Sequence, residues 1–385
     1  MLREIILLLI FFGQFRTELC GQNYERYKKL IDTSLYSKQL GYTKTVTITV
    51  PIEWQEKIEG DFPLIVIFDQ QNQRSHNYIL NTIDYLTSNE QLPSSILVSI
   101  TSNSEFRYLE TTLKKRDERG LALENEYFLF DELIPLLKKQ YKASSFKIII
   151  GHSRYAFFAS SLFLKRINEL NAVIAISPFF SQKNINLIDS VANIQKQKFN
   201  SHKYFRFSVG DDFPSDYYKM DSVIKGINTP YFNAKGFLFK EAGHNVTPGL
   251  TVGISLYEIF EIWAACQNKY MDKSTLDIHA IDSLENEISN FYGNRLKFSI
   301  GTLNGKGWFF YNERQYEKAI KVWELLIQKY PNFSEAYVYI IDAKIQLKKD
   351  YLNDIDELKN SLKFSDFYNE EAKQEIMEKL KEMIK

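Results

Sequence analysis

Hydrophobic and polar positions follow two different patterns along the chain. Between about residues 40 and 265, short apolar runs alternate with segments of helical period. Continuous runs such as Pro63–Phe68 and Ile96–Ile100 are typical of strands buried on both faces of a sheet, whereas Tyr127–Tyr141 has the apolar spacing of an amphipathic helix. We therefore expect an α/β fold with a mainly parallel sheet. The other predicted strands are Thr43–Val50, Lys147–Ile150, Ala172–Ile176, Tyr204–Val209 and Gly236–Lys240, and the other predicted helices are Tyr78–Leu86 and Phe157–Ile167.

The pattern changes after about Leu276, where β-branched runs stop and helical spacing dominates. Leu303–Tyr337 alternates small and aromatic residues at that spacing and breaks at Pro331, so it resembles a tetratricopeptide repeat. A second, degenerate unit is expected in Ser334–Phe364. The residues that match the repeat are Gly307 and Tyr311 on its first helix and Ala319 and Tyr330 on its second.

Two domains follow from this change of pattern. We place an α/β domain at residues 22–270 and a small all-α domain at residues 271–385. Stand-alone repeat domains usually need three or more units, so the helices should pack against the first domain. A plain helical cap without repeat character is the alternative.

The first 21 residues resemble a secretory signal peptide. A charged start at Arg3 and Glu4 precedes the apolar run Ile5–Phe12, and the segment ends at Cys20 and Gly21. Cleavage after Gly21 would give a secreted or periplasmic protein, because this run is too short for a stable membrane span. An N-terminal helix packed on the domain is the alternative, and a lipid anchor on Cys20 is disfavoured by the residues before it.

Charge and composition argue against several classes of protein. Lys+Arg and Asp+Glu both number 48, so the formal net charge is zero and binding of nucleic acid through phosphates is not expected. The two cysteines cannot form a disulfide framework, and Cys266 lies in an apolar helical run typical of a core. Neither a metal-ligand cluster nor a glycine-rich phosphate loop is evident, so we expect no metal and no cofactor.

The strongest local signal for chemistry is a strand that ends in Gly151-His152-Ser153 and leads into a helix. This arrangement is typical of the nucleophile elbow of α/β-hydrolases, in which a strained turn lifts the serine hydroxyl above the sheet edge. The usual motif has Gly two residues after the serine, and here Tyr155 occupies that position. A serine that only caps the helix is the alternative to a nucleophile.

A serine nucleophile needs a base, which in this fold follows it in the chain after the acid. His244 lies in a polar loop between a predicted strand and a later helix, and it is the preferred base; a histidine that only caps the loop is the alternative. The other histidines, His76, His152, His202 and His279, are disfavoured by chain order or by position.

The acid should follow the strand Tyr204–Val209, which ends in Gly210-Asp211-Asp212. We favour Asp212, with Asp211 as the alternative acid and Asp216 as a further candidate. A simple aspartate turn would explain the same residues.

Together these segments resemble the esterase family of α/β-hydrolases that includes esterase D and the enterochelin esterases, over residues 40–265. Departures are Gln70-Gln71 after Asp69, where the family usually has Gly, and Tyr155-Ala156 for a Gly pair. The matching segments, in order, are Pro63–Asp69, Leu92–Ile100, Arg107, Glu132–Pro135, the Ser153 elbow, Ile176–Pro178 and Gly243-His244.

The resemblance implies a serine esterase with an α/β-hydrolase fold, an acyl-serine intermediate and a small-molecule ester as substrate. It also implies an oxyanion hole formed by the backbone N–H of Arg154 and one from the loop Gln70-Gln71, with Gln70 preferred, and it implies Arg107 and Tyr155 as substrate contacts. Two alternatives remain: a peptidase with the same triad, and a non-catalytic protein that binds a protein partner through its C-terminal helices.

Overall fold

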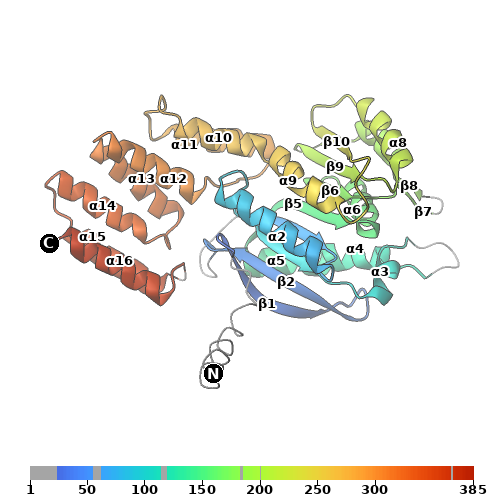
Figure 1. Cartoon of the computed structure of the whole chain (residues 1–385), viewed down its shortest axis with the longest axis horizontal. Coiled ribbons are helices and arrows are strands. Elements are labelled where there is room, and N and C mark those ends of the chain that lie inside the picture. Colours follow the sequence, from blue (N-terminus) through green and yellow to red (C-terminus); the bar gives the residue numbers. More distant parts are fainter. Residues whose placement is uncertain (1–23, 55–61, 114–118, 183–184, 200, 366) are drawn as a thin grey trace, which may run out of the picture.

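The computed structural model describes residues 24–54, 62–113, 119–182, 185–199, 201–365 and 367–385 (Figure 1). The predicted signal peptide at residues 1–21 lies outside these residues.

The described part of the α/β region is built on one sheet of eight strands in the order β1-β2-β4-β3-β5-β6-β9-β10. β1 and β2 pair antiparallel, β2 pairs antiparallel with β4, and the remaining neighbours are parallel. The strands are β1 (Tyr27–Tyr36), β2 (Thr43–Pro51), β3 (Phe62–Phe68), β4 (Ile96–Ile100), β5 (Ala143–His152), β6 (Ala172–Ile176), β9 (Lys203–Val209) and β10 (Phe232–Leu238), and a separate hairpin pairs β7 (Ser181–Gln182) with β8 (Ile185–Asn186).

Helices cover both faces of the sheet, as the continuous apolar strands require. On one face Ile65 and Ile67 of β3 belong to the same core as α2 and α9, and on the other face Leu64 and Val66 pack with α5, α6 and α8. The helices of this region are α2 (Gln73–Ser88), α3 (Ser104–Glu110), α4 (Ala122–Tyr127), a π-helical turn (Phe128–Leu133), α5 (Ile134–Tyr141), α6 (Arg154–Lys165), α7 (Leu187–Ala192), a 3₁₀ turn (Ile194–Lys196), α8 (Pro214–Lys225), α9 (Thr247–Ile259) and α10 (Glu261–Met271). The α/β fold class is therefore confirmed.

The elements differ from the sequence-based expectations mainly at their ends. The expected helix Tyr127–Tyr141 is interrupted by the π-helical turn, and the strand expected at Gly236–Lys240 runs instead from Phe232 to Leu238. β1 was not predicted, because it is a largely polar edge strand that pairs only with β2.

The C-terminal helices continue the core of the α2 and α9 face. Trp263 and Cys266 of α10 are fully buried in one apolar cluster that extends to Trp323 of α13. In Figure 1 these helices lie beside the α/β region, connected to it through α10 and α11. The tetratricopeptide assignment stays a prediction, and the helices are α11 (Ala280–Tyr292), α12 (Ile300–Asn312), α13 (Tyr316–Lys329), α14 (Glu335–Gln346), α15 (Leu352–Phe364) and α16 (Glu370–Met383).

Within the described ranges no single helix combines the length and hydropathy of a membrane span. α9 and α10 reach that threshold only together, as a pair bent by 58°.

Candidate active site

Ser153 occupies a strained turn between β5 and α6. Its φ of 58° and ψ of −119° lie in a region that non-glycine residues rarely adopt. Gly151 makes this turn possible, because a Cβ there would lie 2.3 Å from the main-chain oxygen of Tyr155. Ser153 is partly exposed, and its hydroxyl makes no hydrogen bond to any other described residue. The turn has the geometry that the elbow motif predicts.

His244 and Asp212 meet beside this turn. His244 Nδ1 lies 2.5 Å from Asp212 Oδ2, and the two residues come from the loops that follow β10 and β9. Burial raises the pKa of Asp212, but the hydrogen bond and the charge of His244 lower it more, so the net pKa falls below the usual value. Asp212 is therefore a carboxylate that orients the His244 ring.

The alternative acids lie elsewhere. Asp211 is exposed, and its carboxylate makes no hydrogen bond within the described part of the chain. Asp216 accepts a hydrogen bond from the Phe180 N–H at 3.1 Å. The structure thus places Asp212, rather than Asp211 or Asp216, against His244.

The two loops that carry Asp212 and His244 are joined by main-chain contacts. The Asp211 N–H donates to the Ala242 carbonyl at 2.9 Å, and the Gly210 N–H donates to Asp212 Oδ1 at 3.1 Å. A Cβ at Gly210 would lie 2.1 Å from the Ala242 oxygen. Only glycine permits this approach, which brings the loop of Asp212 close to the loop of His244.

Gly210→Ala should therefore separate the two loops and lower any catalytic activity that depends on the contact between Asp212 and His244 by about 100-fold, the cost of a misplacement of about 1 Å. Gly243→Ala is the matched control in the same region, because a Cβ at Gly243 meets nothing within 4 Å. Steady-state kinetics on both variants checks this. Equal activities in the two variants would contradict it.

His152 also holds the His244 loop, a role that chain position alone did not suggest. Its Nε2 donates to the main-chain oxygen of His244 at 3.0 Å, and the two rings lie 4.5 Å apart. The Thr247 hydroxyl donates to the same oxygen at 2.9 Å. Burial, followed by the neighbouring His244, lowers the pKa of His152 to about 4, so its ring is neutral near pH 7. The available sequence signal was its adjacency to Ser153.

His152 and His76 should make the fold sensitive to acid. Burial lowers the pKa of both to about 4, below the usual 6.5. Between these values the unfolded chain binds protons that the folded chain does not, so the free energy of unfolding falls as the pH drops from about 6.5 to about 4. Each histidine should contribute up to about 3 kcal/mol of this loss.

Urea titrations at a series of pH values measure this effect. The double variant His76→Gln, His152→Gln should flatten the curve between pH 6.5 and 4. An unchanged slope in that variant would assign the acid sensitivity to other groups.

The oxyanion-hole prediction needs one correction. The Gln70 N–H donates to the Ile100 carbonyl at 3.2 Å, so it is engaged in holding the chain after β3 and is not available to an oxyanion. The N–H groups of Gln71 and of Arg154, the first residue of α6, have no hydrogen-bond acceptor among the described residues. The available pair is thus Arg154 and Gln71.

Tyr155 is not placed to contact a substrate. It is fully buried and stacks on Phe68, with ring centroids 4.4 Å apart. Its hydroxyl hydrogen-bonds to Glu110 and lies 2.5 Å from the Ser102 hydroxyl. The Tyr155 ring, which stands where the motif usually has Gly, packs in the core. This buried position does not support the predicted substrate contact at Tyr155.

Arg107 lies near the elbow but is already paired. Its Nε and Nη2 each lie 2.7 Å from a different carboxylate oxygen of Asp69, and Nη2 also lies 3.4 Å from the His152 carbonyl. The side chain is 26% exposed. A substrate would have to compete with Asp69 for this guanidinium.

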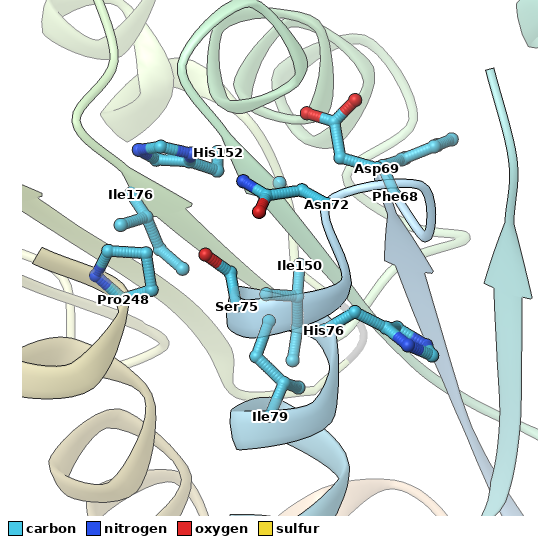
Figure 2. A pocket seen from close by; sticks show the side chains of 11 residues that line it. Phe68, Asp69, Asn72, Ser75, His76, Ile79, Ile150, His152, Ile176 and Pro248 are labelled. Carbon is cyan, nitrogen blue, oxygen red and sulfur yellow. The ribbon is translucent and has the colours of Figure 1, made fainter. Parts of the chain in front are cut away.

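A small cavity lies beside the elbow (Figure 2). Figure 2 shows His152 on one side of it and Asn72 and Ser75, from the start of α2, on another. Its volume is about 10 Å³, comparable to the space needed by one water molecule, so an ester would not fit there. The described residues also contain no cluster of three or more His, Cys, Asp or Glu side chains suited to a metal.

Comparison with known proteins supports the fold. No protein-family model matches the sequence, and a search of curated proteins found no match. Among solved structures, an uncharacterised protein from Capnocytophaga ochracea matches with a TM-score of 0.58 and 12% identity, covering 93% of this chain and 99% of the other. An IroE-like serine hydrolase from Shewanella oneidensis matches with a TM-score of 0.61 and 16% identity, covering 79% and 99%.

A siderophore hydrolase from Aspergillus nidulans matches with a TM-score of 0.51 and 14% identity, over 63% of this chain and 97% of the other. At these identities the likeness concerns the fold, which is that of the α/β-hydrolases. The Capnocytophaga protein covers almost the whole chain, so its likeness includes C-terminal helices.

Proposed function

We propose that this protein is a serine hydrolase that cleaves carboxylic esters through an acyl-serine intermediate. The observation that carries the proposal is the 2.5 Å contact between His244 and Asp212 beside the strained Ser153 turn. Ser153, Asp212 and His244 follow one another in the chain order of an α/β-hydrolase triad, and His152, next to Ser153, hydrogen-bonds to the main-chain oxygen of His244.

The chemistry follows from the roles of these groups. His244 Nε2 takes the proton of the Ser153 hydroxyl as its oxygen attacks the ester carbonyl, and Asp212 stabilises the resulting imidazolium. The tetrahedral oxyanion accepts hydrogen bonds from the N–H groups of Arg154 and Gln71, near the positive end of α6. The alcohol then leaves with the proton from His244. Water, activated by the same ring, cleaves the acyl-serine and releases the acid.

The fold neighbours support a hydrolase. Two of the matched structures are described as a serine hydrolase and a siderophore hydrolase. The zero net charge of the chain does not distinguish a neutral ester from a charged one. The substrate class therefore has to be inferred from the residues of the site. Export from the cell and a partner role for the C-terminal helices remain proposals that rest on the sequence.

A fluorophosphonate probe tests the proposal, because it reacts with activated serines. The full-length protein should be labelled, Ser153→Ala should not, and Ser161→Ala, which changes a serine further along α6, should keep the label. Turnover of p-nitrophenyl acetate without cleavage of peptides distinguishes an esterase from a peptidase. Folded protein without Ser153-dependent labelling would contradict catalysis and favour the partner-binding alternative.

A further inference from the structure

Several charged side chains around the Ser153 turn form ion pairs, but Arg154 forms none with another described residue. Asp69 pairs with Arg107 at 2.7 Å, and Asp212 pairs with His244. One layer deeper, Lys44 pairs with Glu110 at 2.7 Å. The side chain of Arg154 has no carboxylate within ion-pair distance among the residues that the structure describes.

Arg154 is held in place by neutral groups. Its Nε and Nη2 each lie 3.0 Å from a threonine hydroxyl, those of Thr111 and Thr112. Its guanidinium carbon lies 4.1 Å from the centre of the Tyr108 ring and 5.8 Å from that of Phe179. These contacts orient the cation without neutralising it.

This arrangement favours binding of an anion. Partial burial, together with nearby Arg107, lowers the pKa of Arg154, so the cation is destabilised by its surroundings. An incoming carboxylate would offset that cost, and the guanidinium N–H groups not used by the threonines remain available to donate to it. Arg107 is less suited, because its fork already holds Asp69.

We propose that the Arg154 side chain binds a carboxylate of the substrate, so that the site prefers esters that carry a negative charge. Arg154 directly follows the nucleophile, and this places its cation within one side-chain length of the reacting ester. Tyr108, which is 52% exposed, and Phe179 would flank the chain that links the ester to the carboxylate. The inference rests on the proposed esterase function and adds the substrate class.

Two pairs of matched esters test it on the full-length protein. One pair carries the charge on the alcohol side: 3-(4-acetoxyphenyl)propanoate and its primary amide. The other carries it on the acyl side: the monophenyl ester of adipic acid and its amide. In each pair the two esters have similar size and intrinsic reactivity, so the ratio of their kcat/KM values reports recognition of the charge.

In at least one pair the wild type should favour the carboxylate, and Arg154→Gln should lower the ratio by about 10-fold to 100-fold, mainly through KM. Arg154→Lys should give a ratio between those of the wild type and Arg154→Gln, because lysine keeps the positive charge but lacks the paired N–H donors of the guanidinium. Arg295→Gln, which removes an exposed arginine between α11 and α12, is the control and should match the wild type. The same ratio in all variants for both pairs would overturn the inference.

A binding measurement separates this inference from the proposed function. Calorimetry with Ser153→Ala protein and the monophenyl adipate and phenylpropanoate esters reports on Arg154 without turnover. Weaker binding after adding Arg154→Gln supports the carboxylate site even if no ester is hydrolysed. If each ester binds equally well to Ser153→Ala protein with and without Arg154→Gln, the carboxylate site is overturned. Ser153-dependent hydrolysis of the neutral esters would then leave the esterase function intact.

Discussion

Asp212→Asn is expected to lower kcat for ester hydrolysis by about 10³-fold to 10⁴-fold, with little change in KM. The carboxylate accepts the Nδ1–H of His244 at 2.5 Å and so keeps Nε2 free to take the serine proton. An amide at this place can donate to Nδ1 instead, which leaves the proton on Nε2 and removes the base. It also removes the negative charge that stabilises the imidazolium. Steady-state kinetics with p-nitrophenyl acetate measures both parameters.

The neighbouring carboxylate is the matched control for this prediction. Asp211→Asn changes an exposed side chain and leaves its main-chain bond to Ala242 in place, so its activity should stay within about threefold of the wild type. A large loss in Asp211→Asn with a small one in Asp212→Asn would reverse the assignment of the acid.

Glu110→Ala is expected to lower the free energy of unfolding by about 3–5 kcal/mol. Glu110 is fully buried and accepts hydrogen bonds from Lys44 at 2.7 Å, from Ser102 and Tyr42 at 2.5 Å, and from Tyr155. Its removal leaves the Lys44 ammonium, itself 2% exposed, without its counterion. Chemical denaturation measures the change.

Two further variants isolate the cause. Glu287→Ala breaks the exposed Lys269 pair and should cost less than about 1 kcal/mol. The double variant Lys44→Met, Glu110→Leu removes both buried charges and should recover most of the stability lost in Glu110→Ala. If the double variant is less stable than Glu110→Ala, the unpaired Lys44 charge is not the source of the loss.

This buried cluster also explains why the bulky residue at the elbow is compatible with the fold. Tyr155 stands where a small residue was expected, and its hydroxyl hydrogen-bonds to Glu110 of α3. Arg107 belongs to the same helix and reaches Asp69 at the end of β3. The cluster therefore connects the α6 segment behind the nucleophile to the helix that carries Arg107.

The sequence by itself determined the α/β class, most of the central strands and the serine turn. Strands buried on both faces need continuous apolar runs, and a strand–Gly-x-Ser–helix segment is local, so both can be recognised within a few residues. His244 could be selected by chain order, because the fold places its base after the acid.

Only the tertiary structure decided which polar groups meet. Asp211 and Asp212 are adjacent, and the sequence favoured Asp212 without excluding Asp211; in the structure Asp212 is the one that contacts His244. Gln70 and Gln71 differ by one residue, but the first N–H is taken by Ile100 of a neighbouring strand. Arg154 could be recognised as a cation without a carboxylate partner in the described part of the chain only once the structure showed that the charged side chains near it pair with one another. These choices depend on partners far away in the chain, and local spacing carries no information about them.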